Sequence, residues 1–181
     1  MNLKQKYTLS ECNEIKALYE IAFPPEEKKP FSLILQKSDE GHMQIFAIEE
    51  NDGRFLGLAI FILHGDLALL DYLAIVPTER GRGIGSLALS LLKRHFTGKR
   101  FLLEIEDVDE PNADNKPDRI RRRNFYLRNR MFEMPYRIRL FGVQMRVLTG
   151  GAPVSFAEYH ALFPAVFGEK AASHIQLIEE L

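Results

Sequence analysis

The sequence predicts an α+β fold in which helices cover a mixed β-sheet. Strand-like apolar segments alternate along the chain with segments whose apolar residues recur at helical spacing. Residues 67–106 read strand, helix, strand, an order that favours a right-handed crossover between two parallel strands. Residues 43–63 contain two apolar segments joined by Asn51-Asp52-Gly53, a sequence typical of a hairpin turn between antiparallel strands. We therefore expect a sheet with both kinds of pairing.

Length, composition and charge indicate one domain. The 181 residues are 46% hydrophobic, enough to build a core over residues 1–150, with residues 151–181 as a helical extension of the same domain. The net charge of −1 gives no general reason to expect nucleic acid or a membrane as partner. A single cysteine, Cys12, excludes an internal disulfide. Because neither a signal peptide nor a membrane-spanning segment is recognisable, we expect a cytoplasmic protein.

The first half of the chain is expected to hold two helices before its strands. Ser10 is interpreted as the start of the first helix, whose apolar residues recur at helical spacing as far as Ala22. A charged loop over residues 24–30 precedes a short helix over residues 31–36. Residues 67–76 are almost continuously apolar, as in a strand buried on both faces, and Asp71 interrupts them.

In the second half of the chain, predicted helices and strands alternate as far as residue 148, and the tail follows. A helix over residues 85–96, ending near Gly98, leads to a strand over residues 101–106 and a polar loop over 107–118. A basic helix over residues 119–129 and one or two strands within 136–148, interrupted near Gly142, follow. In the tail, Ser155 and Glu158 fit a capping box, and we expect Pro164 and Gly168 to divide short helices.

The segment between the buried strand and its helix has the chemistry of a pyrophosphate site. Unpaired N–H groups at a helix N-terminus attract an anion, and glycines let the backbone approach it closely. A P-loop lysine is missing, and the third glycine of a dinucleotide-binding turn would fall on Ser86. A flexible turn with solvated arginines is the alternative. The expected binding residues are Arg80, Gly81, Arg82, Gly83, Ile84, Gly85 and Ser86.

Residues 73–92 resemble motif A of the GNAT superfamily of N-acetyltransferases, Arg/Gln-x-x-Gly-x-Gly/Ala, which Arg80, Gly83 and Gly85 match. Asn124-Phe125-Tyr126, some forty residues later, resembles motif B, and the likeness covers about residues 46–148. The resemblance implies a mostly antiparallel twisted sheet with a splayed parallel strand pair, and acetyl-CoA as cosubstrate. It also implies further cofactor-binding residues: the main chain of Leu73, Ala74 and Ile75, together with Arg123 and Asn124.

The resemblance places Tyr126 where a tyrosine donates a hydrogen bond or proton to the CoA sulfur, although the pattern alone also fits a half-buried packing residue. Amine acetylation demands no covalent nucleophile, so direct transfer in a ternary complex is the simpler mechanism. Three carboxylates are candidate bases. Asp71 would be costly to bury unless paired or used, and Glu104 and Glu106 share one face of their strand, as a catalytic or an ion-paired surface.

Four arginines, at positions 119, 121, 122 and 123, crowd the expected start of a helix, where the macrodipole disfavours cations. The acidic loop, the CoA 3′-phosphate and nucleic acid are the candidate partners. The five histidines show no metal-ligand spacing, so we expect no metal. One departure from motif B is Arg130, which stands where the superfamily commonly has glycine at the helix end.

We therefore expect an acetyl-CoA-dependent N-acetyltransferase acting on a primary amine of a small molecule or peptide. Two alternatives are a non-catalytic acyl-CoA-binding or regulatory module and an arginine-driven binder of nucleic acid or an acidic partner, the latter weakened by the balanced charge. The apolar side chains of the tail fit a cover for the sheet, a cap on the acceptor pocket or a homodimer surface.

Overall fold

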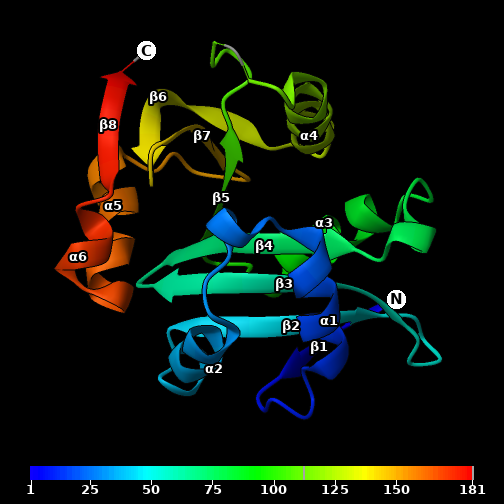
Figure 1. Cartoon of the computed structure of the whole chain (residues 1–181). Coiled ribbons are helices and arrows are strands. Elements are labelled where there is room, and N and C mark those ends of the chain that lie inside the picture. The colour runs from blue at the N-terminus through cyan, green and yellow to red at the C-terminus, as the bar shows by residue number, and fades with distance from the viewer. Residues whose placement is uncertain (112, 181) are drawn as a thin grey trace. The chain divides into compact units, whose positions relative to one another are not determined.

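A computed structural model describes residues 1–111 and 113–180, apart from the side chains of Glu26 and Glu180. Asn112 of the acidic loop and Leu181 of the tail lie outside the described residues. Within the described ranges, eight strands form one sheet in the order β1-β2-β3-β4-β5-β7-β6-β8 (Figure 1). β4 and β5 are parallel, and the pairs of β1 with β2, β5 with β7, and β6 with β7 and β8 are antiparallel. The predicted α+β class with a mixed, mostly antiparallel sheet is confirmed.

The chain forms two compact units. Unit 1 comprises residues 1–63 and 70–97, and unit 2 comprises residues 64–69 and 98–181. No helix of the described part of the chain is long and apolar enough to cross a membrane. The elements along unit 1 are β1 (Asn2–Lys6), α1 (Asn13–Ala22), η1 (Pro25–Glu27), α2 (Phe31–Asp39), β2 (Met43–Glu49), β3 (Phe55–His64), most of β4 (Leu67–Ile75), η2 (Pro77–Glu79) and α3 (Ile84–His95).

Unit 2 contains the last residue of β3, the first residues of β4 and the chain from Gly98 to the C-terminus. Its sheet pairs β5 with β7, β7 with β6 and β6 with β8. The elements are β5 (Arg100–Glu106), α4 (Lys116–Arg128), β6 (Phe132–Leu140), β7 (Val143–Thr149), α5 (Phe156–Phe167), α6 (Glu169–Ala172) and β8 (Ile175–Glu180).

The core of unit 1 is built from strands that are buried on both faces and from the helices that cover them. Ile48 and Leu56 pack with Ala88 of α3, and the Phe46 ring lies 5.0 Å from the His95 ring. Tyr19 of α1 is fully buried, and its ring meets that of Tyr72 on β4 edge to face at 4.8 Å. Alternation of side chains along each strand makes this burial possible, because successive residues point to opposite faces.

The predicted start of the first helix at Ser10 is wrong. The helix begins at Asn13, after Cys12, and no side chain caps it. Glu11 instead accepts hydrogen bonds from the N–H of Thr8 at 3.0 Å and the Thr8 hydroxyl at 2.9 Å. These contacts close a separate turn before the helix, which offers the polar side chains there a local alternative to capping.

Both predicted turns between antiparallel strands are confirmed. Gly53 closes the turn between β2 and β3 with φ +90°, and Phe141 and Gly142 join β6 to β7 with φ +46° and +90°. Positive φ at two successive residues is the geometry whose twist suits a tight hairpin. β6 begins at Phe132, earlier than the sequence indicated.

The tail contains a strand that the sequence did not predict. The capping box of Ser155 and Glu158 is confirmed at the start of α5. The predicted break at Pro164 is wrong, because α5 continues through this residue to Phe167 and ends at Gly168. A proline inside a helix removes one N–H donor, and packing of the flanking residues can offset that cost. β8 then pairs antiparallel with β6, so residues 151–181 are not wholly helical.

Candidate functional site

The glycine-rich segment forms an open N-terminus for the 12-residue helix α3. Gly83 is the N-cap residue with φ +79°, and Gly81 has the same φ. The first hydrogen bond of this turn runs from the Leu87 N–H to the Gly83 carbonyl oxygen at 3.1 Å. Among the described residues, the N–H groups of positions 84–86 therefore have no backbone acceptor. A Cβ at either glycine would meet no atom within 4 Å, so the space beside these donors is open.

The end of β4 leads directly into this segment. Arg80 Nε donates to the Ile75 carbonyl oxygen at 3.1 Å, which ties the turn to the last residue of the strand. Leu73 and Ile75 are half-buried, while Ala74 is buried. On β3, a Cβ at Gly57 would lie 2.4 Å from the Ala74 carbonyl oxygen, so only glycine allows the two strands this close approach.

A buried carboxylate holds two arginines beside the open helix end. Glu79 accepts from Arg82 Nη1 at 2.7 Å and from Arg54 Nη1. Arg54 also donates to Glu50 through Nε at 3.1 Å. Neither Arg54 nor Glu79 was predicted from the sequence. Their pairing depends on the β2–β3 turn, and the only sequence signal was an acidic residue directly before a basic segment.

Asp71 is paired. Its two oxygens accept from Lys29 Nζ at 2.8 and 2.9 Å, and its side chain is only 8% exposed. The neighbouring Tyr72 hydroxyl accepts from the Lys29 N–H at 3.1 Å and donates to the Glu27 carbonyl oxygen at 2.8 Å. The charged loop predicted over residues 24–30 is thereby fastened to β4, and the cost of burying Asp71 is offset by its partner.

Glu104 and Glu106 lie two residues apart on β5, on one face as predicted. Glu104 accepts a hydrogen bond from the Tyr159 hydroxyl of α5. Glu106 accepts from Arg122 Nη1 at 2.6 Å, Asn115 Nδ2 at 2.9 Å and Arg119 Nη2 at 3.0 Å. For Glu106, the ion-paired interpretation is the one that the structure shows.

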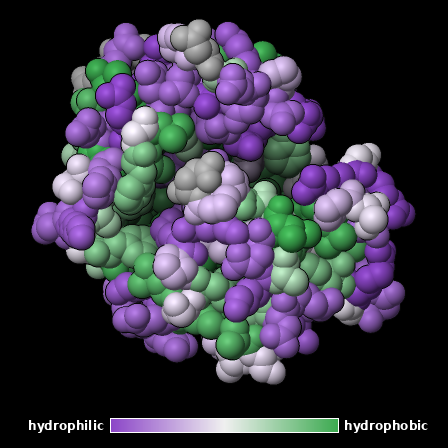
Figure 2. All heavy atoms as spheres, viewed as in Figure 1, coloured by the Kyte–Doolittle hydropathy of each residue, from purple (hydrophilic) through white to green (hydrophobic). Residues whose placement is uncertain are grey.

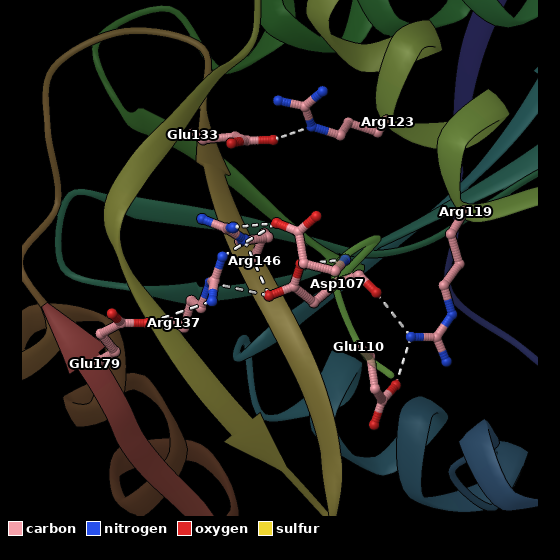
Figure 3. A network of polar contacts seen from close by, with 9 residues as sticks. Asp107, Glu110, Arg119, Arg123, Glu133, Arg137, Arg146 and Glu179 are labelled. Carbon is pink, nitrogen blue, oxygen red and sulfur yellow. Dashed lines mark hydrogen bonds and ion pairs between the residues drawn. The ribbon is translucent and has the colours of Figure 1, made fainter. Parts of the chain in front are cut away.

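The basic helix begins at Lys116, so the prediction that arginines crowd its first turn is wrong. Asp118 occupies that turn, where the macrodipole favours an acid. Each of the four arginines has a carboxylate partner: Arg119 with Glu106 and Glu110, Arg121 with Asp118, Arg122 with Glu106, and Arg123 with Glu133. Figure 3 shows the pairs of Arg119 with Glu110 and of Arg123 with Glu133. The Glu133 carboxylate raises the pKa of Arg123.

A second ion-pair cluster stands beside this helix in unit 2. Asp107 is fully buried, and it accepts from Arg146 Nε at 3.1 Å and lies 3.2 Å from Arg137 Nε (Figure 3). Asp109 binds the same two arginines at 3.0 and 3.1 Å. On the face drawn in Figure 2, hydrophilic side chains gather over the part of unit 2 that contains α4.

Tyr126 lies on α4 and is half-buried. Burial raises the pKa of its phenol to about 12, and the Arg122 charge acts in the opposite direction. Within the described part of the chain, no protein group is hydrogen-bonded to its hydroxyl, which leaves this donor available. Asn124, two residues earlier, is exposed. No group of three metal-ligating side chains occurs among the residues that the structure describes.

Arg130, which stands where motif B commonly has glycine, adopts the backbone conformation expected of that glycine. Arg130 has φ +61°, the left-handed conformation that glycine usually supplies at a helix end. The Met131 N–H donates to the Tyr126 carbonyl oxygen at 3.1 Å and the Arg130 N–H to the Leu127 carbonyl oxygen at 3.0 Å. α4 therefore ends as a glycine-terminated helix would, with strain at Arg130 in place of glycine's freedom.

A strand, a glycine-rich turn whose N–H groups lack backbone acceptors and a following helix are the arrangement expected from the resemblance to GNAT motif A. Residues 12–130 match the model of the Acetyltransferase (GNAT) family, and the chain belongs to this family. It is a GNAT acetyltransferase that uses acetyl-CoA, as the sequence predicted. A comparison with curated proteins found no match.

Solved structures share the fold at low sequence identity. A GNAT-family protein from Bacteroides thetaiotaomicron is 22% identical with a TM-score of 0.73, and the alignment covers 93% of this chain and 99% of that one. The ribosomal-protein-S18-alanine N-acetyltransferase of Escherichia coli is 16% identical, with a TM-score of 0.61 and coverage of 85% and 95%. The spermidine N-acetyltransferase of Vibrio cholerae, in complex with CoA and spermine, is 12% identical, with a TM-score of 0.61 and coverage of 87% and 97%.

Proposed function

We propose that this protein transfers the acetyl group of acetyl-CoA to a primary amine of a small molecule or peptide, directly within a ternary complex. The observation that carries the proposal is the N-terminus of α3, with three N–H groups that lack backbone acceptors beside two glycines of positive φ. Arg80 adds positive charge at the same place, and Arg82 lies there paired with Glu79 at 2.7 Å. These donors fit the diphosphate of a CoA molecule.

The proposed acceptor class agrees with what two structural neighbours are named for. One acts on spermidine, a small polyamine, and the other on an alanine of ribosomal protein S18. At 12% and 16% identity these likenesses concern the fold, so the amine is part of the proposal and the choice between a small molecule and a peptide is left to experiment.

In the proposed reaction, the neutral amine attacks the thioester carbonyl carbon, a C–N bond forms, the C–S bond breaks and the amine loses a proton. Acetyl-CoA supplies the activated acetyl group. Tyr126 donates a hydrogen bond or its proton to the departing thiolate, and because its pKa is about 12 the phenol is protonated throughout the neutral range. The main chain of Leu73, Ala74 and Ile75 binds the pantetheine arm, and Arg123 and Asn124 contribute to the cofactor site.

Asp71, Glu104 and Glu106 are the three candidates for the base, which acts directly or through water. The three carboxylates differ in their partners: Asp71 is bound to an ammonium group, Glu106 to two guanidinium groups, and Glu104 to a phenol. No finding favours a nucleic-acid role, because the four arginines at positions 119, 121, 122 and 123 already have carboxylate partners.

Calorimetric titration tests the cofactor site. Wild-type protein and a variant with Arg82→Ala and Gly83→Val are titrated with acetyl-CoA, CoA and dephospho-CoA. Valine at φ +79° is strained and places a branched side chain in the open space, so binding should fall below detection. The matched control is Arg121→Ala, which removes an exposed arginine from α4 and should leave binding unchanged. Wild-type protein that binds none of the three compounds would contradict the proposal.

Turnover is then measured as release of CoA thiol from acetyl-CoA, with spermidine and a peptide that begins with alanine as the two probes. N-acetylated product from either one supports the amine class. Binding of acetyl-CoA without transfer to any primary amine would instead support a non-catalytic acyl-CoA-binding module.

A further inference from the structure

One face of α4 is fastened to the last residue of β5. Glu106 is 8% exposed, and both of its carboxylate oxygens are used. Oε1 accepts from Asn115 Nδ2 at 2.9 Å and lies 3.0 Å from Arg119 Nη2, while Oε2 accepts from Arg122 Nη1 at 2.6 Å. One strand residue thus binds the residue before α4 and two successive turns of the helix.

Arg119 completes this fastening from the helix side. It is 7% exposed and is the one buried residue that α4 has within the described chain. Its Nε donates to Asn115 Oδ1 at 2.6 Å, and Nη1 donates to the Asp107 carbonyl oxygen at 2.8 Å and to Glu110 (Figure 3). A helix without a buried apolar stripe depends on such contacts for its position. We call Glu106, Asn115, Arg119 and Arg122 the α4 clamp.

The α4 clamp lies on the same side of the helix as Tyr126. At 3.6 residues per turn, Tyr126 is rotated by about 20° from Arg119 and about 40° from Arg122 around the axis. The rise from Arg122 to Tyr126 is about 6 Å. The guanidinium of Arg122 is close enough to lower the pKa of the Tyr126 phenol against the effect of burial. Any rotation of α4 that loosened the clamp would therefore turn the Tyr126 hydroxyl as well.

We propose that Glu106 is a positioning residue, which through Arg119 and Arg122 fixes the rotation of α4 and with it the direction of the Tyr126 hydroxyl. This inference rests on the proposed role of Tyr126 as donor to the CoA sulfur. It gives Glu106 a task different from that of a base: its oxygens hold two guanidinium groups and leave the amine proton to another acceptor. The sequence offered Glu106 as a candidate base or as part of an ion-paired surface shared with Glu104, without a link to Tyr126.

An acceptor-free measurement tests the positioning directly. 3-Fluorotyrosine is placed at position 126, and its ionisation is followed by 19F NMR; the fluorinated phenol is more acidic than tyrosine, so it titrates at a pH that the fold tolerates. Glu106→Gln should lower the pKa of this phenol by about one unit, because looser helix packing admits water and Arg122 loses its counter-ion. The control Asp118→Asn removes a charge of the same sign from a carboxylate of α4 that is 55% exposed and should shift nothing. An unchanged pKa in Glu106→Gln would overturn the inference.

Kinetics separates positioning from base catalysis. With the amine that turns over, Glu106→Gln should lower kcat about ten-fold with little change in the KM for acetyl-CoA, and the acidic limb of the pH profile should remain. In a Tyr126→Phe background, the same substitution should cause no further loss. Loss of the acidic limb would identify Glu106 as the base, and a full ten-fold loss in the Tyr126→Phe background would show that the clamp acts elsewhere.

The two ideas can fail separately. If Tyr126→Phe alone leaves kcat unchanged, the proposed donor role of Tyr126 is wrong, while the 19F titration still reports whether the clamp orients this side chain. If Glu106→Gln does not fold, Arg122→Gln replaces it, because that arginine is 45% exposed and its loss leaves Arg119 in place. Arg122→Gln should then lower kcat without loss of the acidic limb, and an unaltered kcat would count against the inference.

Discussion

Helices α3 and α4 differ in the contacts that hold them in place and in the state of their N-terminal ends. α3 buries Ala88, Leu89 and Leu92 and keeps the donors of its first turn without backbone acceptors. α4 buries only an arginine, and acidic groups surround its start. One helix is held by apolar contacts and leaves its N-terminus open, and the other is held through charges that occupy its N-terminal part.

A polar N-terminus can stay free for a ligand only when something else holds the helix in place, and in α3 that is an apolar face. Where the holding contacts are themselves charged, as in α4, the cations are neutralised by carboxylates of the same chain. A run of arginines is then weak evidence for a nucleic-acid site.

The largest effect is expected from Arg119→Met. Removal of one member of a buried ion pair leaves carboxylates without full compensation, at a cost of about 3–5 kcal/mol in the free energy of unfolding. Urea unfolding followed by circular dichroism measures it, since the chain has no tryptophan.

Leu89→Ala in α3 is the matched comparison for that prediction. Leu89 is fully buried, so its truncation should cost about 2–5 kcal/mol through lost burial and a cavity. If α4 were held by apolar packing as α3 is, Arg119→Met would cost less than about 1 kcal/mol, and the contrast between the helices would disappear.

The next effect concerns Tyr126. Tyr126→Phe should lower kcat about a hundred-fold at saturating acetyl-CoA, because the thiolate loses its donor. The phenol's pKa of about 12 lies above its ordinary value of 10, so its neutral form is favoured by folding. That stabilisation is complete below pH 10 and is lost as the pH rises toward 12. The wild-type pH profile should therefore show no basic limb from Tyr126 in the neutral range, and a limb that Tyr126→Phe removes near pH 8 would contradict this assignment.

The smallest effect is expected at α5, whose N-terminus is closed by its own side chains. Ser155→Ala should cost about 1 kcal/mol, the usual loss for an N-cap. Hydrogen bonds from Ser155 and Arg100 lower the pKa of Glu158 from 4.5 to about 2, so this carboxylate stabilises the fold above pH 4.5 and loses its effect as the pH falls toward 2. Ser155→Ala should move the acid unfolding midpoint upward; Ser173→Ala, away from this cap, serves as the control.

Most elements were predictable because their signals are local. The β2–β3 turn, the α3 glycines and the capping box of α5 each follow from a few neighbouring residues whose conformational preferences agree. β8 was not predictable in the same way, because a six-residue segment becomes a strand only when a partner such as β6 is present. The predicted helix break at Pro164 was wrong for the same reason, because packing overrode the local preference of proline.

The candidate site likewise contains features that depend on neighbouring residues and features that depend on tertiary contacts. The sequence by itself determined the open helix end at Gly81 and Gly83, because positive φ and unpaired N–H groups are properties of the local chain. Only the tertiary structure decided which carboxylates are ion-paired. Whether Asp71 and Glu106 are bases or ion-pair partners depends on cations that lie 42 residues before Asp71 and 13 to 16 residues after Glu106. An electrostatic environment is set by distance in space, and the order of residues does not encode that distance locally.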